Sequence, residues 1–239
     1  MRKFYQTEWQ GIPFESFSSV SSDTLAGAQF YEAFYEEFFK RHTTWDDIDP
    51  RWIATKNRAV QLVASRIHDQ DCCLSIGCGL GYIEKQLLEM HKFDLQVTET
   101  SATTLKWLTP LLPPDHLHIG FFPGCIPPES SYDLIYLSGV DYCFDQEAWP
   151  NFLIAVRSKL KTNGRCLIIS GSLQRESVKA TLRTLAVDCM VNLGMRKRGQ
   201  FWGYLRTMDD YKTAMGAAGF SRQQDGALAD GTYWIEGHV

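Results

Sequence analysis

The chain has 239 residues, of which 44% are hydrophobic and 22% are charged, and its formal net charge is -4. This ordinary globular composition excludes disordered, collagen-like and low-complexity classes. No apolar run reaches the roughly 18 residues that a membrane span requires, and no signal-peptide core follows Met1. The seven cysteines contain no C-x-x-C pair, which favours reduced thiols in a cytoplasmic protein without a structural metal. The mild acidity argues against nucleic-acid binding.

Two helices are predicted before the sheet begins. Aromatic and acidic residues recur at helical spacing over residues 28–41. The second helix is expected to run to about His68, with Asp49 as its N-cap and Pro50 at its first position. We therefore interpret residues 1–70 as an N-terminal helical cap.

Short apolar runs then alternate with helical stretches. The expected strands are 72–76, 93–98, 116–122, 132–138 and 165–170, and the expected helices between them are 82–91, 101–112 and 146–160. This alternation is typical of a parallel sheet covered by helices on both faces, and it predicts a Rossmann-like, doubly wound α/β fold.

The last third of the chain departs from this rhythm. Residues 171–206 contain no convincing strand and are interpreted as an inserted helical cap. A helix at 208–218 precedes two strands, 220–224 and 232–238, which we expect to form an antiparallel hairpin at the edge of a seven-stranded sheet. Without an internal repeat or a Gly/Ser linker, residues 71–239 are predicted to be one core.

A glycine-rich loop follows the first strand of that core. Residues 74–82 read LSIGCGLGY, and glycines at such a turn let the backbone approach a ligand at a helix N-terminus. Tyr82 stands where the dinucleotide fingerprint needs its last glycine, which disfavours NAD, and no G-K-[ST] follows to make a P-loop. Glu99 ends the second strand, where a carboxylate can accept both hydroxyls of a ribose.

Together these residues resemble the class I S-adenosylmethionine-dependent methyltransferases from about Asp71 to the C-terminus. The sequence LSIGCGLG is similar to the first motif of the family, and Glu99 falls at its ribose-binding acid. Residues 132–144, 160–169 and 206–220 look like the motifs of the fourth strand, the fifth strand and the helix before the final hairpin. The resemblance implies S-adenosylmethionine as cofactor and S-adenosylhomocysteine as product.

The resemblance also implies a set of cofactor-binding residues. It assigns the glycine loop to the methionine and ribose, two phenylalanines to the adenine, and the end of the fourth strand to the methionine amino group. The residues are Gly77, Cys78, Gly79, Gly81, Glu99, Thr100, Phe121, Phe122, Ser138 and Gly139. Two positions depart from the family pattern. Ser75 replaces the usual acid beside the first glycine, which weakens the expected hold on the amino end, and Phe121 replaces an Asp near the adenine.

Candidate catalytic residues follow from the chemistry of methyl transfer. The transfer is an in-line displacement, and a hydroxyl acceptor gains from a general base. We consider Asp141, which follows the fourth strand, and His42, beside the N-terminal cap; a turn or N-cap role is the alternative for Asp141. The aromatic candidates for acceptor binding are Tyr31, Tyr35, Tyr142 and Trp202, for which core packing is the alternative.

The segment 157–206 is strongly basic, with eleven Lys and Arg against two acids. Arg175, Lys179 and Arg183 recur on one helical face, and Arg198 closes a basic run. These charges favour an anionic acceptor, with Arg198 as a candidate ligand, although a solvated helix face is the alternative.

The expected function is O-methylation of a small anionic or sugar-like acceptor, such as a glycan or natural-product precursor, by a monomer or homodimer. The alternatives are an RNA or protein methyltransferase and a non-catalytic S-adenosylmethionine-binding regulator. The base-stacking motif [DNS]-P-P-[YFW] is missing after the fourth strand, which disfavours methylation of a nucleic acid.

Overall fold

The computed structural model describes residues 2–19, 23–171, 189–191, 193–195, 198–229 and 231–239. Its centre is a seven-stranded sheet of order β10-β11-β8-β7-β4-β5-β6. The strands are β4 (Cys72–Ile76), β5 (Asp94–Glu99), β6 (Leu117–Ile119), β7 (Tyr132–Ser138), β8 (Leu160–Ser170), β10 (Ser221–Ala227) and β11 (Tyr233–His238). Five strands, β4 to β8, run parallel, and β11 pairs antiparallel with both β8 and β10. The predicted parallel sheet with a hairpin at its edge is therefore confirmed.

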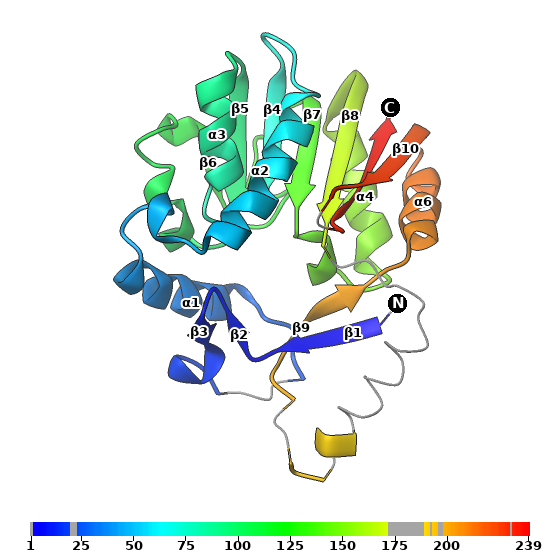
Figure 1. The fold of residues 1–239 in the computed structure, drawn as a ribbon. Helices are drawn as coiled ribbons and strands as arrows, with labels where there is room; N and C mark the ends of the chain where they lie inside the picture. The colour runs from blue at the N-terminus through cyan, green and yellow to red at the C-terminus, as the bar shows by residue number, and fades with distance from the viewer. Residues whose placement is uncertain (1, 20–22, 172–188, 192, 196–197, 230) are drawn as a thin grey trace.

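Helices cover both faces of this sheet (Figure 1). They are α2 (Pro50–Ala64) and α3 (Tyr82–Met90) on one face, and α4 (Ala148–Ser158) and α6 (Met208–Ala217) on the other. Side chains alternate along β7, so that Leu134 and Tyr136 pack with α2 and α3 while Ile135 and Leu137 pack with α4 and α6. All four are fully buried, which explains why the strand reads as one continuous apolar run.

The N-terminal helices follow the local sequence signals. Helix α1 spans Ala28–Arg41, as predicted, and the Asp49 side chain caps α2 by accepting a hydrogen bond from the Arg51 backbone N–H over 2.8 Å. Helix α2 ends at Ala64, short of the expected His68. Because α2 packs on the sheet, we propose that the cap ends before Pro50 instead of at residue 70.

The predicted helix at 101–112 is wrong. The segment contains a short 3-10 helix, η3 (Thr103–Trp107), followed by turns. Thr103 and Thr104 are β-branched and lose rotamer freedom in a helix, while Pro110 and Pro113 cannot continue one. The other 3-10 helices are η1 (Phe14–Ser16), η2 (Trp45–Asp47), η4 (Pro114–His116) and η5 (Asp141–Cys143).

The two caps are joined by a β-ribbon that the sequence did not reveal. Strand β1 (Arg2–Gln6) pairs antiparallel with β9 (Gln200–Leu205), and β2 (Glu8–Trp9) pairs with β3 (Ile12–Pro13). The N-terminal cap thus contains short strands beside its predicted helix, and the expectation of no convincing strand within 171–206 is wrong. Each partner of the β1–β9 pair is short and lies about 200 residues from the other, so neither shows a strand signal by itself.

The combined cap has an aromatic core of its own. Trp9 stacks on Phe34 with ring centroids 4.6 Å apart, and Phe14 stacks on Trp202 at 5.1 Å. Helix α1, β1 and β9 lie beyond the carboxyl ends of the parallel strands. In Figure 1 the arrowheads of β7 and β8 point toward them. The cap therefore covers the edge of the sheet where the glycine loop lies. None of the described helices is both long and apolar enough to cross a membrane.

Candidate functional site

A cavity of about 740 Å³ lies between the cap and the carboxyl ends of β4, β5, β7 and β8. The chain passes from β4 to β5 and β6 on one side, and returns to β7 and β8 on the other. Open parallel sheets bind ligands at such a reversal of strand order. The position of the cavity therefore follows from the topology of the sheet.

The glycine loop forms the floor of this cavity. The Gly77 N–H donates to the Thr98 carbonyl over 2.9 Å, which ties the loop to β5. Gly79 has a φ of +57°, and a Cβ added to it would meet only the Tyr35 hydroxyl, at 3.5 Å. At Gly79 the backbone therefore faces open space, as a close approach to a ligand requires.

Glu99 is held beside the loop by three donors. Its Oε2 accepts from the Gly79 N–H over 3.0 Å, and its Oε1 accepts from the Thr100 N–H and hydroxyl over 2.7 and 3.1 Å. Burial raises the pKa of Glu99 above its ordinary value, although these hydrogen bonds oppose the shift. A carboxylate has about four acceptor positions, so one fixed in this way retains capacity for a ligand hydroxyl.

Nine of the ten predicted cofactor-binding residues line the cavity, and Gly81 does not. Gly81 is the N-cap of α3 with a φ of +70°, and a Cβ there would come within 2.3 Å of Leu108 Cγ. Its role is close packing. Phe121 lines the cavity but is 72% exposed, whereas Phe122 packs on Phe152 with ring centroids 5.7 Å apart. The loop, Glu99 and the phenylalanines together fit a ligand with a ribose and a flat base.

The four aromatic candidates for acceptor binding also line the cavity. Tyr142 and Trp202 are stacked with ring centroids 6.2 Å apart, and the Tyr31 hydroxyl lies 3.9 Å from Cys143 Sγ. Burial raises the pKa of both Tyr31 and Tyr142 well above the ordinary value. These phenols therefore stay protonated at neutral pH and can act as hydrogen-bond donors.

The structure places Asp141 in the protein core and away from the cavity lining. Its side chain is fully buried and accepts hydrogen bonds from the Ser170 hydroxyl, over 2.9 Å, and from the Tyr211 hydroxyl. The Arg206 guanidinium donates to the Asp141 backbone carbonyl over 2.7 Å. This network joins β8, α6 and the loop after β7. The contacts of Asp141 therefore favour the alternative, a structural turn residue, over the role of general base.

Two further candidates lie outside the cavity lining. His42 stacks on Phe38 with ring centroids 4.2 Å apart, and its Nδ1 lies 3.0 Å from the Phe38 carbonyl oxygen. The Arg198 guanidinium lies over the Tyr5 ring at 5.3 Å. We therefore retain neither residue as a catalytic or acceptor-binding group.

Among the residues that the structure describes, the basic segment places no cationic side chain on the cavity wall. Lys161 pairs with Asp133 at 2.7 Å, and Arg165 contacts Asp71 at 3.4 Å, both away from the cavity lining. Arg175, Lys179 and Arg183 lie outside the described residues. Within the described part of the chain, the cavity wall contains no arginine and a single lysine, Lys56.

Sequence reasoning missed Lys56 and Glu84, which both line the cavity. Lys56 lies on α2, which was interpreted as part of a cap. Glu84 lies on the apolar side of α3, among the buried residues Tyr82, Ile83 and Leu87. An acid within such an apolar face was the signal that could have revealed it.

Comparison with known proteins reveals similarity in fold to solved structures. The sequence matches no protein-family model, and no curated protein matches it significantly. Many solved structures are similar to it. One is magnesium protoporphyrin IX methyltransferase from Synechocystis with bound S-adenosylhomocysteine, at a TM-score of 0.60 and 15% identity, covering 87% of this chain and 95% of that one.

Two larger proteins are similar to the chain over part of their length. The pyocyanin biosynthetic protein PhzM has a TM-score of 0.59 and 20% identity over 87% of this chain. Human N-acetylserotonin methyltransferase, in complex with S-adenosylmethionine, has a TM-score of 0.57 and 14% identity over 89% of it. The chain spans only 63% and 56% of these two proteins. At such identities the similarity establishes the fold.

Proposed function

We propose that this chain, which has the fold of class I S-adenosylmethionine-dependent methyltransferases, transfers a methyl group from S-adenosylmethionine to a small organic acceptor. The observation that carries the proposal is the Glu99 carboxylate, fixed by Gly79 and Thr100 beside an open glycine loop. Structural neighbours bind S-adenosylmethionine or S-adenosylhomocysteine, which supports the same ligand here. Glu99 would accept the ribose hydroxyls, and Phe121 and Phe122 would flank the adenine.

The chain contributes alignment and the exclusion of water. The cofactor, when bound, supplies a methyl group on a sulfonium. A bond from the acceptor to the methyl carbon forms as the carbon–sulfur bond breaks, so the acceptor must be held in line with that bond. The cap covers the cavity from the side opposite the glycine loop, where Tyr31, Tyr35 and Trp202 are positioned to hold the acceptor and exclude solvent.

The cap side of the cavity favours a planar acceptor. Its wall contains the aromatic rings of Phe4, Trp9, Tyr31 and Trp202, joined by Tyr142 of the loop after β7. Aromatic side chains bind flat rings by stacking and by edge-to-face contact. A sugar would bring many hydroxyls to a wall with few polar partners and would leave some of them unpaired. We therefore favour an aromatic acceptor over a sugar-like one.

The residues around the cavity also limit the reacting group. Among its described lining residues there is neither a histidine nor an aspartate to take a proton, and the two glutamates, Glu84 and Glu99, are held on the cofactor side by Ser75 and Gly79. An acceptor oxygen whose proton is lost readily in water, such as that of an acidic phenol or enol, needs no such base. The hydroxyls of Tyr31 and Tyr142 would donate to this oxygen and orient it. The proposed reaction is thus O-methylation of an acceptor that is anionic when it reacts.

Calorimetric titration with S-adenosylhomocysteine tests the cofactor. The wild-type protein is expected to bind one equivalent. Glu99→Gln should weaken binding by about 10- to 100-fold, because it removes charge-assisted hydrogen bonds to the ribose. Glu89→Gln is the matched control, since Glu89 is an exposed residue of α3 with 59% of its side chain accessible. Absence of binding at millimolar ligand would reject the proposal.

Turnover separates an enzyme from a binding protein. We expect S-adenosylhomocysteine to form with planar phenols or enols, measured by mass spectrometry across a panel that also contains sugars, RNA and a protein mixture. Binding without turnover on any acceptor would leave only a cofactor-binding protein. Turnover confined to RNA or protein would contradict the proposed acceptor.

A further inference from the structure

A buried carboxylate at the floor of the cavity has no role in the proposed function so far. Glu84, on α3, is 1% exposed and lines the cavity together with Ser75, which is 2% exposed. The Ser75 and Tyr136 hydroxyls both donate to Glu84 Oε1, over 2.6 and 2.9 Å. These contacts fix the carboxylate in one orientation.

The second oxygen of this carboxylate is unsatisfied. Glu84 Oε2 is buried and has no hydrogen-bond partner among the residues that the structure describes. Leaving a buried charged acceptor unpaired is costly, and such groups in native proteins commonly await a ligand or an ion. An ammonium group in the cavity would complete the hydrogen bonding of Glu84.

An opposite charge lies on the neighbouring helix. Lys56, on α2, lines the cavity, and its Nζ donates to Ser138 Oγ over 3.2 Å. Ser75 and Ser138 belong to the paired strands β4 and β7, whose register aligns Ser75 with Tyr136. The charges of Glu84 and Lys56 act on one another, yet no described ion pair joins them. One acid and one base therefore line the same cavity, and no ion pair joins them among the described residues.

We propose that Glu84 and Lys56 together bind the α-amino-acid end of the cofactor, with Glu84 accepting from its ammonium group and Lys56 donating to its carboxylate. This inference rests on the proposed function. An α-amino acid carries both charges on one carbon, so it complements a fixed acid and base that do not neutralise each other. Ser138, at the end of β7, positions Lys56.

The assignment also accounts for Ser75. The family to which the sequence is similar carries an acid at this position, and its loss implied a weaker hold on the amino end. In the structure a carboxylate is present there, but it comes from α3 and is held in place by the Ser75 hydroxyl. The acid has moved from the strand to the helix, so its loss from β4 does not indicate a loss of chemistry.

Two ligands that differ only at the amino-acid end provide the test. S-adenosylhomocysteine carries this end, and methylthioadenosine lacks it while keeping the adenosine and the sulfur. Glu84→Gln and Lys56→Met are each expected to weaken S-adenosylhomocysteine by about 10- to 100-fold, since each removes a charge-assisted hydrogen bond. Methylthioadenosine affinity should change less than twofold, which also shows that the variants are folded.

A compensating variant and a matched control sharpen the result. In the double variant Ser75→Asp with Glu84→Gln, the carboxylate returns to β4, and we expect at least part of the lost affinity to be restored. Glu89→Gln, on the exposed side of the same helix, should bind both ligands as the wild type does.

The two proposals fail in different ways. If the wild-type protein binds neither ligand, the proposed function is wrong. If it binds both and the two variants leave S-adenosylhomocysteine affinity unchanged, or weaken both ligands equally, the proposed function stands and the assignment of Glu84 and Lys56 falls.

Discussion

Three carboxyl groups, those of Glu84, Glu99 and Asp141, have pKa values raised by burial, but their surroundings differ. Asp141 accepts from Ser170 and Tyr211 inside the core. Glu99 and Glu84 line the cavity. A raised pKa alone therefore does not identify a catalytic group; exposure to the cavity separates the two ligand-binding candidates from the structural one.

Burial of Glu84 should make the free energy of unfolding of the ligand-free protein depend on pH. A raised pKa means that the folded state holds its proton above the ordinary value of 4.5, so this group makes folding less favourable as pH rises through that window. The charged or titratable groups that act on it are Lys56, Tyr136 and Cys78; burial raises the pKa of Tyr136 and Cys78 well above their ordinary values, so both stay neutral.

Glu84→Gln is therefore expected to unfold at a higher temperature than the wild type at pH 8, by on the order of 2–4 °C for each kcal/mol of relieved burial. The difference should shrink as pH falls toward 4.5, in thermal unfolding followed by circular dichroism. The same substitution at the exposed Glu89 should give a curve parallel to that of the wild type. A difference between Glu84→Gln and wild type that does not change with pH would contradict the expectation.

At the scale of elements, the β1–β9 ribbon shapes the acceptor side of the cavity. Gly203 of β9 lies opposite Phe4 of β1. A Cβ at Gly203 would come within 2.5 Å of the Tyr142 carbonyl oxygen and 2.6 Å of its ring Cδ2. The Tyr142 ring in turn contacts Phe4 edge-on, with centroids 5.8 Å apart. The ribbon can approach the loop after β7 this closely only because residue 203 lacks a side chain.

Gly203→Ala should therefore displace Tyr142. Overpacking of this kind lowers stability by about 1–3 kcal/mol, measured by urea denaturation. We expect the acceptor KM to rise, while S-adenosylhomocysteine affinity stays within twofold because the glycine loop is untouched. Gly216→Ala is the control, since Gly216 lies on α6 outside the cavity lining and an added methyl there meets only the Gln223 side-chain nitrogen, at 3.5 Å. Equal loss of cofactor affinity in Gly203→Ala would show that the ribbon does more than shape the acceptor side.

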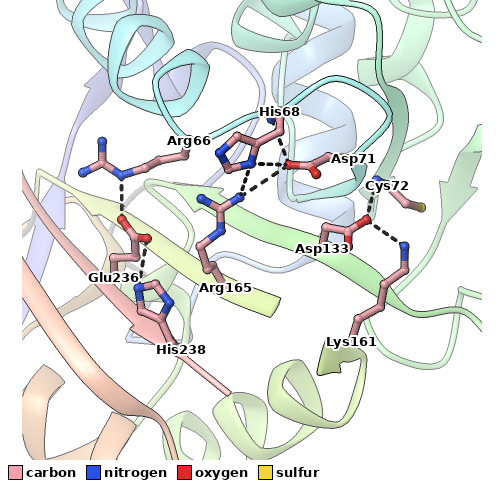
Figure 2. A network of polar contacts seen from close by, with 9 residues as sticks. All are labelled: Arg66, His68, Asp71, Cys72, Asp133, Lys161, Arg165, Glu236 and His238. Atoms are coloured by element: carbon pink, nitrogen blue, oxygen red, sulfur yellow. Dashed lines mark hydrogen bonds and ion pairs between the residues drawn. The ribbon is translucent and has the colours of Figure 1, made fainter. Parts of the chain in front are cut away.

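At the scale of the whole molecule, the two ends of the parallel strands differ in function: one end borders the cavity and the other stabilises the fold. The carboxyl ends of the parallel strands face the cavity. A network of charged side chains lies near their amino ends, where β4, β7 and β8 begin (Figure 2). There Arg66 Nε donates to Glu236 Oε2 over 2.7 Å and His238 lies 3.3 Å from the same carboxylate. Only 4% of the Glu236 side chain is exposed, so this pair ties the segment that follows α2 to β11 within the protein.

Arg66→Met should consequently destabilise the protein without affecting the ligand. Leaving the buried Glu236 carboxylate with His238 alone is expected to lower the free energy of unfolding by about 1–3 kcal/mol. Arg51→Met, in the first turn of α2, is the control, because the Arg51 side chain is 91% exposed and a surface pair contributes about 0–1 kcal/mol. Both variants should bind S-adenosylhomocysteine as the wild type does; weaker binding by Arg66→Met would contradict this division of the sheet.

The sequence by itself determined the features that depend on neighbouring residues. Buried strands such as β7 are visible as apolar runs, Asp49 and Pro50 mark the start of α2, and the glycine loop with Glu99 indicates where a ligand with a ribose would lie. These signals are local because backbone conformation and burial pattern are set within a few residues.

The tertiary structure decided everything that depends on which segments meet. It paired β1 with β9, enclosed Asp141 in the core and brought Glu84 and Lys56 to the wall of one cavity. Which segments meet has no local signal, because it follows from how helices and strands far apart in the chain dock on the sheet; even Glu84, whose place on an apolar helix face is visible in the sequence, shows no partner there. Glu84 shows this most directly, since it lies in the first turn of α3 and its contact with Ser75 forms only once α3 is packed against β4.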